Sequence, residues 1–143
     1  MLSGPLPTGA ITGARERDRA VGDPYLLVVD DDPDVRTLLR IVLAKMGCQV
    51  RESHSGAQAL DLARRRPPDA MLVDLWMPGM SGADVVHTMG TDPELAGIPV
   101  IVATGDTEAS AVPGAFATVT KPFNLDRLRR TVWRAIGSRL PGN

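Results

Sequence analysis

Apolar runs alternate with amphipathic stretches along most of this chain. Three runs, 25–29, 70–73 and 98–103, are apolar throughout, which is typical of strands buried on both faces of a sheet. Two further runs, 48–52 and 116–120, mix polar and apolar residues, as strands at the edges of a sheet do. The pattern therefore predicts five strands, three of them central.

Segments with helical spacing follow the strands. The clearest is 33–46, where Asp32 suits the N-cap, Pro33 suits the first helical position and Gly47 suits the position after the end. We expect its inner face to consist of Val35, Leu38, Leu39, Val42 and Met46, and its outer face to carry Arg36, Arg40 and Lys45.

Three other segments complete the helical pattern. Residues 57–66 and 82–90 predict helices, and Asn124 suits the N-cap of a last one. The segment 107–114 is a weak helix candidate, because Pro113 interrupts it. Strand and helix thus alternate five times, which predicts an α/β fold with a doubly wound parallel sheet. With the mixed strands at the edges, the strand order is 2-1-3-4-5.

Composition narrows the classes of protein that fit. A chain of 143 residues fits one domain, and 3% aromatic residues require an aliphatic core. The net charge of −1 favours neither nucleic acid nor a membrane surface as a partner. The single cysteine, Cys48, excludes an internal disulfide, and no apolar stretch is long enough to span a membrane or to act as a secretory signal. We expect a cytoplasmic domain preceded by a flexible tail over residues 1–24.

Chemistry-bearing residues follow four of the predicted strands, and the carboxyl ends of parallel strands form one crevice. The residues expected there are Asp30, Asp31, Asp74, Thr104 and Lys121. Crowded carboxylates repel one another, and a small hard cation with oxygen ligands, magnesium above all, relieves that repulsion. The additional lysine and hydroxyl donors favour an anionic, tetrahedral guest. A phosphoryl group carried on a carboxylate nucleophile fits this combination.

Four motifs carry a family resemblance. They are Val28-Val29-Asp30-Asp31, the run from Val73 to Gly82, Ala103-Thr104-Gly105 and Lys121-Pro122-Phe123. With these motifs, the chain from about Tyr25 to Ile136 resembles the receiver domain of bacterial two-component response regulators, which has a flavodoxin-like fold. The resemblance implies a receiver domain over residues 25–137 and a short C-terminal tail over 138–143. Because that tail is too short for an output domain, a stand-alone receiver is expected.

The resemblance also implies roles for the crevice residues. Asp74 would accept a phosphoryl group from a histidine kinase or phosphotransfer protein, and Thr104 and Lys121 would each bind a phosphoryl oxygen. Asp31, Asp74 and the backbone carbonyl of Trp76 would ligate Mg²⁺, and Asp30 would act through a water. The domain would catalyse only its own phosphorylation and dephosphorylation. It would pass the signal to an unknown downstream protein without binding nucleic acid directly.

Three features depart from the family pattern. The spacing from Thr104 to Lys121 implies a shortened fourth helix. Thr118 occupies the position where family members often carry an aromatic switch residue, so output through this face of the domain is expected to be altered or absent. Trp76, two residues beyond the acceptor, is expected to slow loss of the phosphoryl group by obstructing the attacking water.

Two alternative functions remain open at this point. A degenerate receiver would act as a phosphorylation-independent interaction module, and the shortened fourth helix is compatible with this alternative. A phosphohydrolase with an aspartyl nucleophile would share the aspartate, threonine, lysine and magnesium. Such enzymes, however, carry the nucleophile after the first strand and usually have a cap domain, for which this chain has no room.

Overall fold

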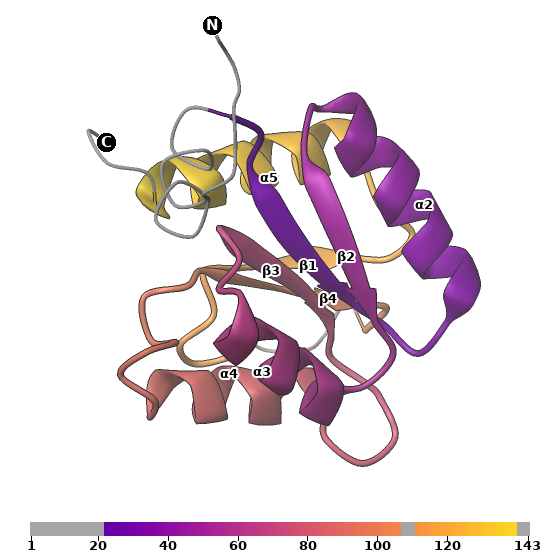
Figure 1. Cartoon of the computed structure of the whole chain (residues 1–143). Coiled ribbons are helices and arrows are strands. Elements are labelled where there is room, and N and C mark those ends of the chain that lie inside the picture. The colour runs from indigo at the N-terminus through magenta and orange to yellow at the C-terminus, as the bar shows by residue number, and fades with distance from the viewer. Residues whose placement is uncertain (1–21, 107–110, 140–143) are drawn as a thin grey trace, which may run out of the picture.

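Five parallel strands form one sheet in the order β2-β1-β3-β4-β5 in the computed structural model, which describes residues 22–106 and 111–139 (Figure 1). The strands are β1 (Tyr25–Val29), β2 (Gln49–Ser53), β3 (Ala70–Asp74), β4 (Val100–Thr104) and β5 (Ala117–Thr120). The predicted number, direction and order of the strands are confirmed.

Helices cover both faces of this sheet. Helices α2 (Pro33–Lys45) and α5 (Leu125–Arg139) pack on one face, and α3 (Gly56–Arg65) and α4 (Gly82–Gly90) pack on the other (Figure 1). This arrangement confirms the doubly wound architecture. None of the described helices has the length and apolar character needed to cross a membrane.

The apolar runs of the central strands are explained by burial on both faces. Successive side chains of a strand point to opposite faces, so Leu27 and Val29 of β1 pack in the α3/α4 core while Leu26 and Val28 pack in the α2/α5 core. Strand β3 divides its side chains between the two cores in the same way. Strand β2, by contrast, has exposed residues alternating with partly buried ones, as an edge strand should.

Helix α2 begins at the predicted residue, but its buried face differs from the predicted one. The Asp32 side chain caps the helix by accepting a hydrogen bond from the Asp34 amide at 2.8 Å. The buried positions are Leu39, Val42 and Leu43, whereas Leu38 is 42% exposed. The prediction that Leu38 lies on the inner face is therefore wrong. Because each residue advances the helix by about 100°, a buried arc centred on Leu39 and Leu43 leaves Leu38 at its margin.

The connection from β4 to β5 differs from the predicted short helix. Residues 105–106 and 111–116, the described part of this connection, contain no helix, and residues 107–110 lie outside the described residues. Pro113 cannot continue a helix, and Gly114 has a φ of +88°, which is left-handed. Val112 and Ala115 nevertheless pack against the α3/α4 core. This segment therefore covers the sheet with turns where a helix was expected.

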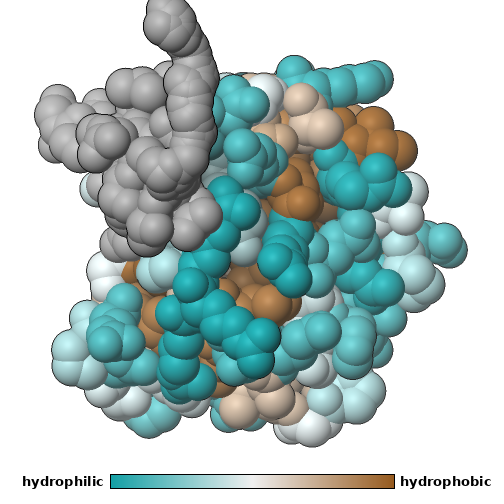
Figure 2. All heavy atoms as spheres, in the orientation of Figure 1, coloured by the Kyte–Doolittle hydropathy of each residue, from teal (hydrophilic) through white to brown (hydrophobic). Residues whose placement is uncertain are grey.

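The ends of the domain are placed as follows. Helix α5 continues to Arg139, two residues beyond the predicted boundary at residue 137. Most of the predicted N-terminal tail (residues 1–21) and the end of the predicted C-terminal tail (140–143) lie outside the described residues. On the side of the molecule shown in Figure 2, hydrophilic side chains dominate the surface and leave a few hydrophobic areas between them.

Candidate functional site

Three carboxylates converge at the carboxyl ends of β1 and β3. Asp30 and Asp31 follow β1 directly, and Asp74 is the last residue of the neighbouring strand β3. Each offers an oxygen atom, and these atoms lie within 4.8 Å of one another. Asp30 and Asp74 are buried whereas Asp31 is exposed, so the group opens to solvent on one side. The convergence predicted from the strand ends is confirmed.

Lys121 supplies the positive charge of the site. Its Nζ atom lies 2.9 Å from Asp30 Oδ2, to which it donates a hydrogen bond, and 3.3 Å from Asp74 Oδ1. The lysine comes directly after β5, and its amide donates a hydrogen bond to the Thr104 carbonyl at the end of β4. The ammonium thus bridges two buried carboxylates whose mutual repulsion it reduces.

Thr104 is buried at the end of β4, 1% exposed. Its hydroxyl oxygen accepts a hydrogen bond from the Asp106 amide at 3.0 Å. The hydroxyl hydrogen remains available to a different acceptor, because a hydroxyl group both donates and accepts. Thr104 therefore lies at the predicted edge of the sheet, where its hydroxyl group can donate a hydrogen bond.

Trp76 contacts the site through its backbone, whereas its indole ring is exposed. Its backbone amide donates a hydrogen bond to the Asp74 carboxylate, and its side chain is 63% exposed. The indole therefore lies largely in solvent, and the predicted coordination through the Trp76 carbonyl stays a prediction. Gly82, which opens α4, lets that helix approach the site closely: a Cβ atom there would lie 2.7 Å from the Asp74 carbonyl oxygen.

The surroundings of the site raise the pKa of both Asp74 and Lys121. Burial raises the pKa of Asp74 and the charge of Asp30 raises it further, while Lys121 and the Trp76 amide offset only part of this effect. Burial alone would lower the pKa of Lys121, but the hydrogen bonds and charges of Asp30 and Asp74 outweigh it, so that pKa is raised. The lysine is therefore held as a cation, and the carboxylates carry more negative charge than it neutralises.

A small divalent cation fits this set of donors. Hard cations such as Mg²⁺ are bound by one or two carboxylates together with waters, and this group is open to water on the side of Asp31. The cation would supply the charge compensation that Lys121 alone leaves incomplete. The residues available to hold it are Asp30, Asp31 and Asp74.

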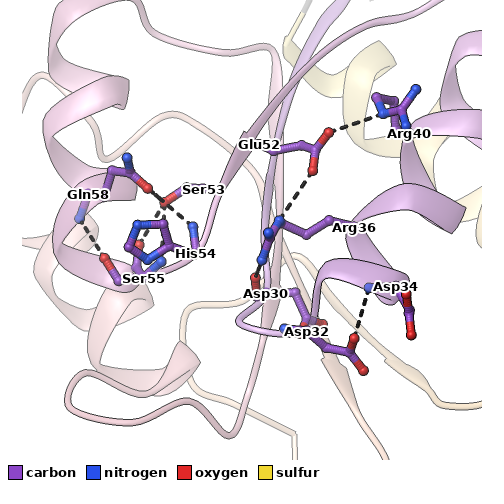
Figure 3. Close-up of polar contacts among 10 residues, drawn as sticks. All are labelled: Asp30, Asp32, Asp34, Arg36, Arg40, Glu52, Ser53, His54, Ser55 and Gln58. Atoms are coloured by element: carbon purple, nitrogen blue, oxygen red, sulfur yellow. Dashed lines mark hydrogen bonds and ion pairs between the residues drawn. The ribbon is translucent and has the colours of Figure 1, made fainter.

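Arg36 is a residue of the site region whose contacts the sequence analysis missed. It was assigned to the outer face of its helix, yet its side chain is only 19% exposed. Its Nη1 atom donates a hydrogen bond of 2.7 Å to the backbone carbonyl of Asp30 (Figure 3). The spacing of Arg36 from Asp30, six residues on and about one helical turn into α2, is the available signal.

Comparisons with known proteins agree with this geometry. The family model of the response regulator receiver domain matches residues 26–133. The protein PilH of Pseudomonas aeruginosa is 37% identical over 112 residues, which cover 75% of this chain and 93% of PilH. The response regulator protein PilR of the same species is 38% identical over 118 residues, which cover 80% of this chain but only 26% of PilR. This chain thus spans about a quarter of the length of PilR.

A solved structure resembles the whole described fold. The receiver domain of the sensor histidine kinase PA1611 from Pseudomonas aeruginosa, crystallised with a magnesium ion coordinated in its active-site cleft, superposes with a TM-score of 0.76. It is 26% identical and covers 81% of this chain and 99% of the solved chain. The strand order, the convergent carboxylates and the extent of the family match lead to one conclusion: this chain belongs to the response regulator receiver domain family.

Proposed function

We propose that this chain is a phosphorylation-dependent switch of a two-component phosphorelay, which accepts a phosphoryl group on Asp74. One observation carries the proposal: Lys121 Nζ bridges Asp30 and Asp74 at 2.9 and 3.3 Å within a group of three carboxylates. A nucleophile, a cation site and a fixed positive charge therefore meet at one edge of the sheet. Phosphoryl transfer to a carboxylate needs all three.

The reaction follows from this arrangement. A carboxylate oxygen of Asp74 attacks the phosphorus of a phosphohistidine on a histidine kinase or phosphotransfer protein. The oxygen–phosphorus bond forms as the phosphorus–nitrogen bond breaks, and the imidazole leaves with the electron pair and takes up a proton. Lys121 then pairs with a phosphoryl oxygen, and the Thr104 hydroxyl donates a hydrogen bond to another. Attack by water on the acyl phosphate releases inorganic phosphate and restores Asp74.

Mg²⁺ is the cation proposed for the site. Asp31, Asp74 and the Trp76 carbonyl would hold it directly, and Asp30 would hold it through a water. When bound, it neutralises negative charge on the carboxylates and on the incoming phosphoryl group. The oxygen-only donor set of the three carboxylates supports this choice over a softer metal.

The proposed switch acts on itself and on proteins. It phosphorylates and dephosphorylates only its own aspartate, so it is not a turnover enzyme, and its downstream partner is a protein rather than nucleic acid. The net charge of −1 supports the last point, and the single cysteine is compatible with a cytoplasmic location. The phosphorylation-independent module is not favoured: the group of Asp30, Asp31 and Asp74 with Lys121 beside it supports a phosphorylated switch instead.

Beryllofluoride, which mimics a phosphoryl group on a carboxylate, tests the proposal. Tryptophan emission is recorded with Mg²⁺ before and after its addition, in a Trp133→Phe background so that Trp76 is the only indole. We expect a saturable change that depends on Mg²⁺, disappears in Asp74→Ala and persists in Asp61→Ala, a matched change at an exposed aspartate.

A second measurement keeps that test decisive when the exposed indole gives no signal. Intact mass is measured after incubation with a small-molecule phosphodonor and Mg²⁺. The addition of one phosphoryl group to the parent chain and to Asp61→Ala, but not to Asp74→Ala, supports the proposal. Equal labelling of Asp74→Ala, or no labelling of any variant, contradicts it.

A further inference from the structure

Arg36 connects the loop that carries two of the carboxylates to the edge strand β2. Its Nη1 atom donates a hydrogen bond to the Asp30 carbonyl at 2.7 Å, and its Nε atom lies 3.2 Å from Glu52 Oε1 (Figure 3). Glu52 lies on β2, one strand away from Asp30 in the sheet. A guanidinium presents its donors in a rigid planar fork, so these two contacts fix its orientation.

The bonded carbonyl belongs to the peptide group that joins Asp30 to Asp31. Fixing this peptide plane restricts the backbone torsions on either side of it, ψ of Asp30 and φ of Asp31. These torsions set the directions in which the two carboxylates leave the backbone. Other contacts hold Asp30 itself: its amide donates to the Ser53 carbonyl, and its Oδ1 accepts from the Asp32 amide. Within the described residues, the Asp31 side chain makes no hydrogen bond or ion pair. The direction of its carboxylate therefore depends on the backbone that Arg36 holds.

We propose that Arg36, held by Glu52, is a positioning residue that aims the Asp30 and Asp31 carboxylates at Asp74 and thereby sets the affinity of the site for Mg²⁺. The inference rests on the proposed function, because it assumes that these carboxylates hold the cation. Side chains that orient the ligands of a metal influence metal affinity by about 10- to 100-fold in other proteins.

Charge alone predicts the opposite result. The guanidinium is positive and lies next to a cation site, so its removal would strengthen Mg²⁺ binding if its field were the main effect. Glu52 lies between Arg36 and Arg40 and neutralises part of that field. The positioning role therefore predicts weaker binding without Arg36 and the electrostatic role predicts stronger binding, so the sign of the change separates them.

Arg40 offers a matched control. Its Nε atom lies 3.1 Å from Glu52 Oε2, so it pairs with the same carboxylate as Arg36 and carries the same charge on the same helix. Figure 3 shows it on the far side of Glu52 from the Asp30 loop. A substitution of Arg40 removes one ion pair and one positive charge without touching the Asp30 carbonyl.

The experiment is a Mg²⁺ titration of the full chain, followed by backbone amide shifts in two-dimensional NMR. The variants are Arg36→Met, Arg36→Lys and Arg40→Met. We expect the Kd for Mg²⁺ to rise about tenfold in Arg36→Met and in Arg36→Lys, because an ammonium keeps the charge but cannot make both contacts. Arg40→Met should stay within about twofold of the parent, since it leaves the peptide plane alone.

Each result decides something. A Kd in Arg36→Met that equals or falls below that of the parent overturns the inference while leaving the proposed function intact. A parent chain that binds no Mg²⁺ overturns the metal site and the inference together. If Arg36→Met does not fold, Arg36→Lys still separates the two roles. It keeps the positive charge, so the electrostatic role predicts an unchanged Kd for Mg²⁺ and only the positioning role predicts a Kd raised about tenfold.

Discussion

The two halves of the site are held in place to different degrees. The residues of the carboxylate half, Asp30, Asp31 and Asp74, precede helices α2 and α4 in the chain, and the first turns of these helices are capped by Asp32 and Ser81. The other half, Thr104 and Lys121, is joined by a connection in which the described residues form turns instead of a helix. The carboxylate half is thus followed by two capped helices, while Thr104 and Lys121 are joined by backbone hydrogen bonds between β4 and β5.

This difference indicates that two properties of the domain are separable. Binding a cation depends on the carboxylate half, whereas accepting a phosphoryl group also requires Lys121 of the other half, whose ammonium contacts Asp30 and Asp74. We expect the passing of the phosphorylated state to a partner to depend on the β4–β5 connection, in which the described residues form no helix. We therefore expect substitutions in the β4–β5 connection to leave the affinity for Mg²⁺ nearly unchanged.

Gly82→Ala should have the largest effect on stability, because the added methyl group would collide with the backbone of β3 next to Asp74. The new Cβ would lie 2.7 Å from the Asp74 carbonyl oxygen and 2.9 Å from the Leu75 Cα, so helix α4 must move away from β3. We expect a loss of about 3 kcal/mol in the free energy of unfolding, measured by urea denaturation.

Gly90→Ala, at the other end of the same helix, is the control for that change. Nothing lies within 4 Å of a Cβ at Gly90, so alanine there should be neutral or stabilise by about 0.5 kcal/mol. Equal stabilities of the Gly82 and Gly90 variants would show that α4 does not constrain the acceptor strand.

Asp74→Asn tests the charge of the carboxylate half and should have the next largest effect. Burial and the Asp30 charge raise the pKa of Asp74 above its ordinary 3.8 in the folded state, so the folded chain binds a proton more tightly than the unfolded chain. Stability of the parent chain therefore falls as the pH rises from about 3.8 through the raised pKa. The asparagine variant escapes that loss and should melt a few degrees higher than the parent at pH 7 without Mg²⁺.

The pH dependence of that difference is the sharper measurement. The difference in Tm should disappear below the ordinary carboxyl pKa, where Asp74 is protonated in both the folded and the unfolded chain. Asp61→Asn, at an exposed side chain, should show no comparable gain at pH 7. A higher Tm for Asp74→Asn that persists unchanged at low pH would point to packing rather than charge as its cause.

Gly114→Ala changes the β4–β5 connection, which joins Thr104 to Lys121. Gly114 has a φ of +88°, and a Cβ there would lie 3.1 Å from Val86 Cγ1, so alanine is strained by its backbone and crowded by a neighbour. We expect a loss of about 1 to 2 kcal/mol in the free energy of unfolding but a Kd for Mg²⁺ within about twofold of the parent.

Gly105→Ala, which has open space around its Cβ and no left-handed φ, is the control in the same connection. It should change stability by less than about 0.5 kcal/mol. A large change in Mg²⁺ affinity in Gly114→Ala would mean that the two halves of the site are coupled.

Much of this architecture could be predicted because its causes are local in sequence. Apolar runs identify strands buried on both faces, and the order of the strands then brings Asp30, Asp74 and Lys121 to one edge without any knowledge of contacts. Asp32 could be assigned as a cap from its position before Pro33.

What the sequence analysis missed depends on partners distant in the chain or on backbone atoms. Arg36 donates a hydrogen bond to a backbone carbonyl, and every residue has such a carbonyl, so the sequence does not single this one out. It also pairs with Glu52, sixteen residues away. Leu38 is exposed because the position of the sheet, not the helical pattern alone, sets which arc of α2 is buried. The turns around Gly114 follow from a left-handed φ that the sequence allows but does not require.

Trp76→Asn should have the smallest effect and tests whether the carboxylate half is shielded from water. The indole follows the acceptor closely in sequence but is 63% exposed, so it covers at most one side of the acyl phosphate. We expect the asparagine variant to lose its phosphoryl group about twofold faster, equivalent to about 0.4 kcal/mol in the barrier. The rate is followed by intact mass after removal of the phosphodonor, with Trp133→Phe as the control for loss of a tryptophan elsewhere. An unchanged rate would mean that water reaches Asp74 from a side the ring does not cover, and that the lifetime is set by Thr104 and Lys121 instead.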